Sequence, residues 1–584
     1  MSTIEDRSPL GYPEAAAGKG LKTGALGLVS SIVVGVASTA PAYSLAAALG
    51  LVVASSGSLV AGVHAPFIML LAFVPMYFIS VAYQELNRAE PDCGTSFTWG
   101  ARAFGPRSGW MTGWGIIVAD VIVMANLAQI AGAYSFTFAN LIGIHNTLDQ
   151  STFWSTVAGV IWIIVMTYIC YRGIEISARI QVALLAIEVI ALVMFAVVAL
   201  VRVYTGHGAT YTGAHHQVEH LSIHPAWSWF LPSGMGAFAI ASALLSAVFI
   251  YWGWDSAVSV NEETENPETT PGRAAVISTL LLLVTYAVVS VAAIAFAGVG
   301  TQGIGLGNDN NSGDVFSAIA PVLFGDSLLG HAARILLAFL ILSSASASTQ
   351  TTILPTARTS LSMASYKALP SAFARIHKKY LTPTVSTIAM GGVSIVFYLI
   401  FTLISESLLT ALISSIGLMI AFYYGLTGFA CAWFYRHNLR SSFRNLVMQG
   451  IFPVLGGLIL AAAFIFAVQQ FLQPDYTVDA NGNNVTIFGL GAAGVVGIVG
   501  LLLGFPLMFV WERIRPDFFR QHTLPKRASD ELVLITDAMD PAGDVALRLP
   551  DSGLPDILIA DDLSNLPPGA RAVRRMDLDK RNEE

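Results

Sequence analysis

Three acidic residues stand within apolar stretches of the chain. Asp120 and Glu188 have valine, isoleucine, leucine and alanine as neighbours, and Asp255 follows a tryptophan. A carboxylate in hydrocarbon is costly and usually faces a cavity, a cation or a proton path. Glu188 has no polar neighbour in its own stretch and is therefore predicted to bind and release a proton. The alternative for Asp120 and Glu188 is a neutral carboxyl group that packs against another helix.

A dense run of hydroxyl residues, Ser343–Thr352, lies in a further apolar stretch just before Pro355. Small hydroxyl residues often serve close helix packing in membranes, and a run of them is equally able to line the path of a cation. Both interpretations stay open. Ser346 and Thr349 in this run join Glu188 as the predicted coupling residues.

Two apolar stretches are interrupted near their middle. The stretch Val33–Tyr43 contains Gly35 and Pro41, and the stretch Phe249–Ser256 contains Gly253. At mid-membrane, glycine and proline free backbone groups that only protein or a water-filled cavity can satisfy. Broken helices at matching places in two halves indicate an inverted-repeat transporter with a midplane binding site, and an ordinary kink is the alternative for each break alone. Amides at a half-helix N-terminus attract an anion such as a carboxylate.

Aromatic side chains flank both breaks. Tyr43 follows the first break, and Tyr251, Trp252 and Trp254 surround the second. These four residues are predicted to wall a substrate cavity. The pair Tyr423–Tyr424 is less informative, because aromatic residues are common at the interfaces of any membrane protein.

Membrane helices must position these residues. The chain has 584 residues, of which 55% are hydrophobic and 11% charged, whereas an ordinary soluble protein has about 25% charged residues. A hydrocarbon core of roughly 30 Å needs about 20 apolar residues per helix, and twelve stretches meet or approach this length. The sequence therefore predicts an all-α polytopic membrane protein. Its predicted spans are 24–52, 59–84, 110–140, 152–171, 177–203, 235–260, 274–298, 332–357, 384–405, 408–435, 449–472 and 487–511.

The basic residues predict the orientation. One set of alternate loops holds fourteen lysines and arginines, whereas the opposite set holds only Arg202 and Arg334. Positive residues are retained on the cytoplasmic side. The alternation supports twelve spans and predicts a multi-pass plasma-membrane protein with both termini in the cytoplasm.

Other classes of function find little support in the sequence. Cys93, Cys170 and Cys431 lie far apart without metal-ligand spacing. The histidines of residues 207–224 fit an exposed polar loop better than a metal site, because no pair at positions i and i+4 lies on an evident helix. No histidine lies in the interior of a predicted span, since His64 stands near the start of the second one, so a membrane-embedded enzyme is not supported. We predict no metal, no cofactor and no nucleic-acid partner.

Four separated groups of motifs resemble the amino acid-polyamine-organocation (APC) transporter superfamily, specifically its bacterial amino acid permeases. The resemblance covers about residues 20 to 512. The motifs are Glu85–Trp99 with Phe104–Pro106, Gly109–Trp110 and Gly113–Trp114; Arg172–Ile174 with Ser177–Gln181; Asn261–Pro267 with Pro271; and Thr356–Ser360 with Leu369–Pro370 and Thr382–Pro383.

The resemblance implies a five-plus-five inverted repeat (LeuT-like) followed by two helices. It also implies that the broken first and sixth helices bind the amino acid backbone. The chain then divides into a cytoplasmic segment 1–20, a transport core 21–435, two further spans within 436–512 and a cytoplasmic tail 513–584. The predicted substrate-binding residues are Gly35, Val36, Ala37, Ser38, Thr39, Ala40, Tyr43, Asp120, Tyr251, Trp252, Gly253, Trp254 and Asp255.

Two features depart from the family pattern. Many members have a Gly-x-Gly break in the first helix, whereas here Gly35 precedes Val36–Thr39 and the break depends on Pro41. This difference leaves room for amines that lack a carboxylate. Relatives often carry a lysine in the fifth helix where Glu188 falls, so the coupling residue here is an acid, which either carries a proton or helps to bind a cation.

The leading hypothesis is a secondary transporter that moves an amino acid or related amine inward through the bilayer by alternating access, coupled to protons. The three acids tilt the prediction toward a cationic or amine substrate. A neutral amino acid with a proton on Glu188 is almost as well supported. The alternatives are a polyamine transporter, an amino acid exchanger, a channel and a transporter-like sensor.

Overall fold

The computed structural model describes residues 19–55, 58–148, 151–212, 218–311, 313–404, 406–478 and 483–527. Most of the predicted terminal segments 1–20 and 513–584 therefore lies outside the described residues. The same is true of part of the histidine-containing loop.

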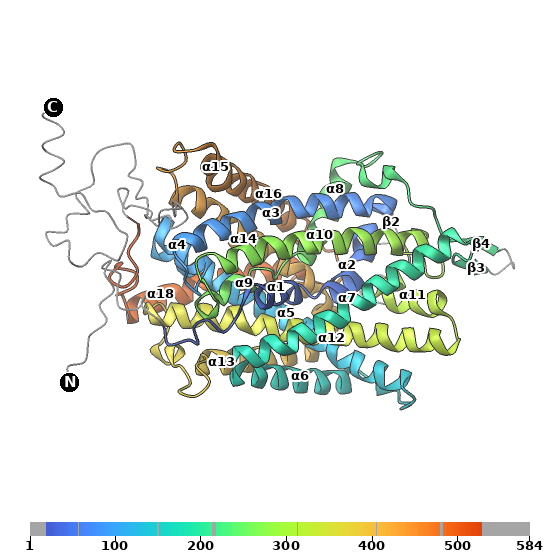
Figure 1. Cartoon of the computed structure of the whole chain (residues 1–584), viewed down its shortest axis with the longest axis horizontal. Helices are drawn as coiled ribbons and strands as arrows, with labels where there is room; N and C mark the ends of the chain where they lie inside the picture. Colours follow the sequence, from blue (N-terminus) through green and yellow to red (C-terminus); the bar gives the residue numbers. More distant parts are fainter. Residues whose placement is uncertain are drawn as a thin grey trace, which may run out of the picture.

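The described part of the chain is built from helices, with three two-stranded hairpins between them (Figure 1). The helices that follow the predicted spans are α1 (Leu28–Ser38), α2 (Pro41–Val53), α3 (Ala65–Ala89), α5 (Pro106–Leu141), α6 (Thr152–Arg172), α7 (Ile174–Tyr204), α8 (Ala237–Ile250), α9 (Ser256–Ser259), α10 (Thr270–Ala297), α12 (Leu328–Ser365), α13 (Thr384–Ile404), α14 (Glu406–Phe434), α16 (Phe452–Phe471), α17 (Ala492–Leu502) and α18 (Gly504–Ile514).

Shorter elements connect the long helices. The helical ones are η2 (Gly62–His64), α4 (Ser96–Phe104), η4 (Trp227–Phe230), η5 (Asn261–Glu263), η6 (Asp309–Asn311), α11 (Val315–Phe324), η7 (Ser371–Ala374), α15 (Phe443–Asn445) and the π-helical η8 (Leu446–Ile451). The strands pair as the antiparallel hairpins β1 (Ala54–Ser55) with β2 (Ser58–Leu59), β3 (Thr210–Thr212) with β4 (Val218–His220), and β5 (Thr486–Ile487) with β6 (Leu490–Gly491).

Eleven helical segments of the described chain are long and apolar enough to cross a membrane. The predicted sixth span, 235–260, is the exception, because its regular part is only the 14-residue helix α8. The chain then leaves the helix at residues 251–255 and resumes as α9. The sixth crossing is therefore broken, as the glycine and the acid near its middle predict.

The order of elements reveals two five-helix units. Each unit begins with a broken helix (α1 and α2, or α8 and α9), continues with a long helix and a short helix (α3 and α4, or α10 and α11), and ends with three long helices (α5 to α7, or α12 to α14). Five crossings reverse the direction of the chain, so the second unit is inverted relative to the first. The predicted five-plus-five fold with two further helices is confirmed.

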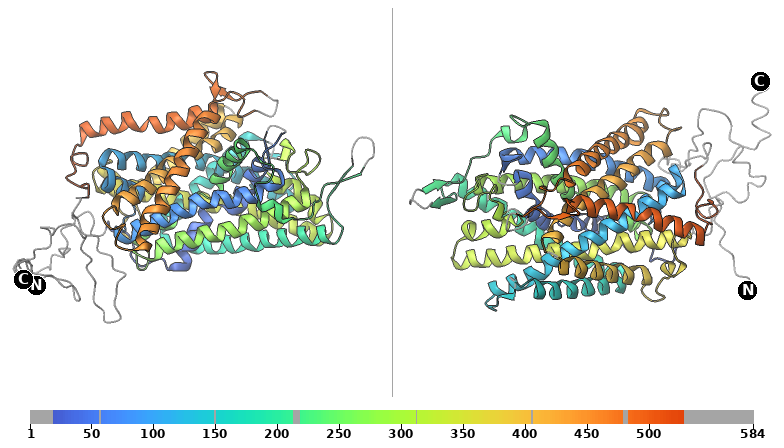
Figure 2. Two further views of the ribbon diagram at one scale, coloured as in Figure 1. Left: turned by 90° about the horizontal axis from the view of Figure 1, so that it is seen from above. Right: turned by 180° about the vertical axis from the view of Figure 1, so that it is seen from behind.

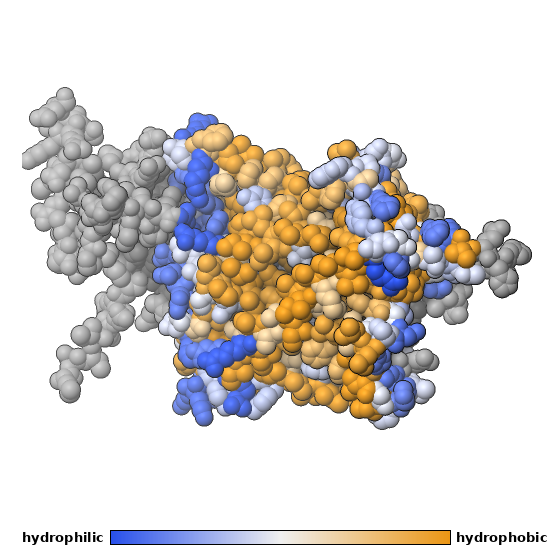
Figure 3. Space-filling view, turned by 45° about the vertical axis from the view of Figure 1, so that its right-hand side comes forward, coloured by the Kyte–Doolittle hydropathy of each residue, from blue (hydrophilic) through white to orange (hydrophobic). Residues whose placement is uncertain are grey.

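A broad apolar belt covers the face of the bundle seen in Figure 3, with polar residues gathered at its two ends. Lys19 and Arg527, the first and last described residues, lie at the same end, since Lys19 pairs with Asp92 and the Arg527 amide donates to the Arg102 carbonyl. We call this the basic end. In Figure 2, α17 and α18 cross the outside of the bundle, where α17 contacts α14 and α18 contacts α5.

Candidate functional site

The two breaks lie directly against each other at the centre of the bundle. Gly253 has φ of +118°, and a Cβ built on it would lie 2.8 Å from the carbonyl carbon and oxygen of Ser38. The hydroxyl groups of Ser38 and Ser256 are also 2.8 Å apart. Only glycine permits this approach, so the second break is shaped to fit the first.

The first break has a simple local cause. Ala40 adopts a left-handed conformation with φ of +45°, and Pro41 then starts α2 without an N–H group to satisfy. The Ser44 hydroxyl donates to the Thr39 carbonyl at 2.6 Å. The break thus depends on Pro41, as the sequence predicts.

The N-terminal amides of α2 are already occupied. The Ala42 N–H donates to Glu188 Oε1 at 2.7 Å, and the Tyr43 N–H contacts the Ser344 hydroxyl oxygen at 3.3 Å. The Ser344 hydroxyl in turn donates to the same Glu188 oxygen at 2.7 Å. A carboxylate from α7 therefore takes the place at the helix N-terminus where an anionic ligand would be expected.

The second oxygen of Glu188 faces no donor. Oε2 is buried and has no hydrogen-bond partner among the described residues. Leaving a buried charged oxygen unpaired is costly, so Oε2 is suited to carry a proton or to face a cation.

Helix α12 supplies polar contacts to both breaks. The Ser348 hydroxyl donates to the Ser38 carbonyl at 2.9 Å. Pro355 has no N–H, which frees the carbonyl of Thr351 within the helix, and the Ser256 hydroxyl lies 3.5 Å from that oxygen. The hydroxyl run therefore serves contacts between helices at the breaks.

The predicted coupling residues of α12, Ser346 and Thr349, do not make these contacts themselves. Thr349 donates to the Ala345 carbonyl of its own helix at 2.8 Å, and the Ser346 hydroxyl is buried without a partner among the described residues. Ser344 and Ser348, which the sequence prediction passed over, make the contacts. Their spacing of four residues, one helical turn, is the signal that would have found them.

The other two intramembrane acids form a separate group. Thr356 donates to Asp120, and the Tyr423 hydroxyl donates to Asp255 at 3.2 Å. Twelve residues of α12 separate Ser344 from Thr356, which is about 18 Å along a helix. The structure thus does not bring Asp120 together with Glu188.

All the predicted substrate-binding and coupling residues are buried, but several face away from the breaks. A Cβ on Gly35 would lie 2.7 Å from the Ser278 hydroxyl of α10, so Gly35 serves the packing of α1 on α10. The Tyr251 hydroxyl donates to the Met69 carbonyl of α3 at 3.1 Å. Tyr43 donates to Asn126 of α5.

A buried ion-paired cluster lies at the basic end. Lys19 pairs with Asp92 at 2.9 Å and also with Glu262, and the lysine side chain is only 3% exposed. We call Lys19, Asp92 and Glu262 the basic-end latch. Burial lowers the pKa of Lys19, but the charges of Asp92 and Glu262 outweigh this effect and hold the pKa well above its ordinary value.

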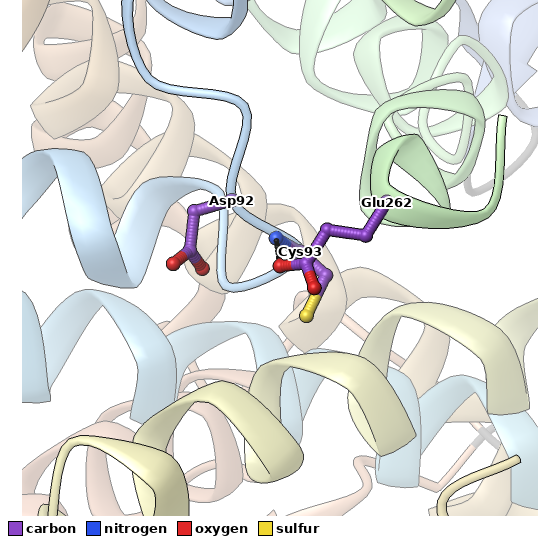
Figure 4. A group of neighbouring side chains, drawn as sticks. All are labelled: Asp92, Cys93 and Glu262. Atoms are coloured by element: carbon purple, nitrogen blue, oxygen red, sulfur yellow. Dashed lines mark hydrogen bonds between the residues drawn. The ribbon is translucent and has the colours of Figure 1, made fainter. Parts of the chain in front are cut away.

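Three potential metal ligands also lie close together here, namely Asp92, Cys93 and Glu262 (Figure 4). The position between the two carboxylates is, however, taken by the Lys19 ammonium. Burial and the Glu262 charge raise the pKa of the Cys93 thiol well above its ordinary value, so the thiolate that binds metals is disfavoured. The geometry indicates an ion-pair cluster.

The chain that leads into α1 crosses the basic end beside the latch. The amides of Ala25 and Leu26 donate to the Glu263 carbonyl at 2.8 and 3.1 Å. The Glu263 carboxylate in turn pairs with Arg358 of α12 through two bonds of 2.6 and 2.9 Å. Buried, two-bond pairs of this kind fix geometry strongly, and they connect both broken helices to α12.

A sequence profile described as amino acid permease matches residues 25–493. The chain belongs to the amino acid permease family. This membership confirms the resemblance that the four groups of motifs carry.

The chain spans about half the length of two curated relatives that it matches. The branched-chain amino acid permease BcaP of Bacillus subtilis (strain 168) is 25% identical over 248 residues, which are 41% of this chain and 49% of the relative. The Asc-type amino acid transporter 1 of Mus musculus is 25% identical over 332 residues, which are 56% of this chain and 57% of the relative. The crystal structure of MhsT in complex with L-phenylalanine covers 75% of this chain and 97% of its own, with 14% identity and a TM-score of 0.49.

Proposed function

We propose that this permease carries an amino acid across the plasma membrane by alternating access, with proton uptake at Glu188 as the coupled step. The observation that carries the proposal is the placement of the Glu188 carboxyl group. One of its oxygens holds the Ala42 amide, and the other is buried without a partner among the described residues.

Glu188 and a substrate carboxylate compete for the same donors. Ionised Glu188 occupies the first amide of α2 and repels a second negative charge strongly in a medium of low dielectric constant. Protonation removes this repulsion and weakens the bond from Ala42, because hydrogen bonds to a charged acceptor are about twice as strong as neutral ones. The amide then becomes available to the substrate, so proton and amino acid bind together.

The contacts around the breaks suggest which parts move. The two breaks touch α12 through Ser348 and Thr351, and the latch holds the basic end closed. We infer that α1 with α2 and α8 with α9 move against α12, and that the latch opens to release substrate. We place the basic end in the cytoplasm, the transport core in residues 21–435, and the last two crossings, within 436–512, outside that core.

A related amine is a second candidate substrate, favoured by the same occupied amides. A molecule without a carboxylate needs no free donor at the start of α2, and its ammonium group would pair with ionised Glu188. Protons then compete with the substrate instead of accompanying it. Uptake of an amino acid should rise as the outside pH falls, whereas uptake of such an amine should fall.

Proteoliposomes that contain the full-length permease test the proposal. The measurement is uptake of a labelled branched-chain amino acid and of a small amine, each with and without an imposed proton gradient. We expect the gradient to drive accumulation by the wild type and by Glu175→Gln, which changes an exposed acid of the same helix. It should not drive accumulation by Glu188→Gln. Gradient-driven accumulation that persists unchanged in Glu188→Gln would overturn the coupling role.

A further inference from the structure

A basic cavity lies at the edge of the apolar belt, away from the two breaks. It has a volume of about 160 Å³, many times the roughly 15 Å³ that one water needs. It is lined by Gln84, Arg88, Glu268, Thr269, Arg273 and Arg444.

Three elements far apart in the sequence bring three guanidinium groups to this cavity. Arg88 comes from the last turn of α3, Arg273 from the first turn of α10, and Arg444 from α15. Bringing these positive charges close together costs free energy unless an anion lies between them.

The acids nearby only partly balance these three charges. Glu85 pairs with Arg444 at 2.6 Å and lies 4.0 Å from Arg88, and Glu268 belongs to the lining. Three positive groups thus face two negative ones. The N-terminus of α10, a 28-residue helix, adds its partial positive charge at the same place. The excess of positive charge favours an anionic occupant.

Exposed apolar side chains continue from the cavity into the belt. Leu280 and Leu281 lie two turns beyond Arg273 on the same face of α10. On the other side, Ile451 at the end of η8 and Leu455 and Leu458 of α16 are exposed. Phe443, beside Arg444, is 81% exposed. Helix α3 lies between α10 and α16 and contacts both (Figure 1), so the apolar faces of α10 and α16 border the cavity on its two sides.

We propose that the cavity binds the phosphate of an anionic phospholipid, whose acyl chains lie along the exposed faces of α10 and α16. The three arginines supply the donors for the phosphate oxygens, as arginine clusters do in phosphate recognition. Free inorganic phosphate shares the headgroup chemistry but gains nothing from the apolar faces.

Thermal unfolding of the full-length permease in detergent tests this site. The additions are phosphatidylglycerol, phosphatidylcholine and inorganic phosphate, because a ligand that binds the folded state raises Tm. We expect phosphatidylglycerol to raise Tm more than phosphatidylcholine does, and inorganic phosphate to leave it unchanged. Equal shifts from the two lipids, or a phosphate shift that matches phosphatidylglycerol, would overturn the proposal.

Two variants and one control locate the site. Removing one arginine near an anionic lipid weakens binding about five-fold. The Arg273→Gln variant should therefore need about five times more phosphatidylglycerol to reach the same rise in Tm. Arg444→Gln should act in the same direction, and Tm without lipid reports whether each variant is folded. Arg440→Gln is the control, because Arg440 is exposed, lies four residues before Arg444 and does not line the cavity. An Arg273→Gln response equal to that of the control contradicts the site.

Discussion

Glu188 Oε1 accepts the backbone N–H of Ala42 at 2.7 Å, which places a side-chain carboxylate from α7 at the start of α2. The same oxygen also accepts the hydroxyl of Ser344 from α12. One acid thus joins three helices at the first break. In the proposed mechanism, the charge of Glu188 decides how strongly it holds the Ala42 amide and whether a substrate carboxylate can bind there.

Replacing Glu188 by glutamine should abolish the pH dependence of substrate binding. The wild type is expected to bind an amino acid more tightly at pH 5 than at pH 8, because protonation frees the Ala42 amide. The glutamine side chain is neutral at both pH values, so the Glu188→Gln variant should bind the amino acid equally well at pH 5 and pH 8. The shift in Tm that substrate causes in the purified protein measures this, and Glu175→Gln is the control that should follow the wild type. A pH-dependent response in Glu188→Gln would argue for another titrating group.

Replacing Gly253 by alanine should destabilise the permease severely. The residue has φ of +118°, and its new Cβ would meet the Ser38 carbonyl at 2.8 Å. Backbone strain and overlap together cost at least about 2 kcal/mol. Gly236→Ala is the matched control in the same predicted span, because nothing lies within 4 Å of its Cβ position and its φ is −74°. Thermal unfolding compares the two, and equal Tm values would show that the breaks do not pack as described.

The sequence predicts the helices better than the contacts between them. Hydropathy and the break at Pro41 are local properties, so the spans and both interruptions are visible without a structure. Which face of a helix meets which neighbour depends on the packing of the whole bundle. Gly35 illustrates this limit, since its small size serves the approach of Ser278 from α10. Ser344 and Ser348 were likewise hidden within a run of similar residues.

The extra length of α12 was also invisible from hydropathy. The predicted span 332–357 ends near Pro355, whereas the helix extends from Leu328 to Ser365. The polar last turns of the helix are held by buried partners, as the pair of Arg358 with Glu263 and the bond from Ser362 to Asp92 show. Tertiary contacts therefore extend a helix that composition alone would end.

Replacing Lys19 by alanine should open the basic end. Removing one partner of a buried ion pair costs about 3–5 kcal/mol, and it leaves Asp92 and Glu262 to repel each other. The buried thiol of Cys93 should then react faster with a maleimide, which mass spectrometry of the labelled peptide measures. Lys22→Ala is the control, because Lys22 pairs with Glu175 at an exposed position. Equal labelling of Cys93 in the two variants would contradict the latch.

The latch should persist throughout the pH range in which Glu188 is proposed to titrate. Burial raises the pKa of Asp92, but the Lys19 ammonium and bonds from Gly94 and Ser362 outweigh this effect and lower it to about 2. Because the folded pKa lies below the unfolded value of about 3.9, the stabilisation is complete above that value and is lost as pH falls toward 2. The gap in Tm between wild type and Asp92→Asn should stay constant from pH 8 to pH 5 and narrow below about pH 4. A gap that changes between pH 5 and pH 8 would speak against this assignment.

Replacing Asp120 by asparagine should slow transport without uncoupling it from protons. Asp120 receives its bond from Thr356, about 18 Å along α12 from the Ser344 contact with Glu188. Asparagine keeps an oxygen for Thr356 to donate to, and the change from a charged to a neutral acceptor weakens such a bond by about 1 kcal/mol, or roughly five-fold in rate. In proteoliposomes, the Asp120→Asn permease should still accumulate substrate when a proton gradient is imposed, whereas Glu188→Gln should not. Loss of gradient-driven accumulation in Asp120→Asn alone would move the coupling site from the start of α2 to the group around Asp255.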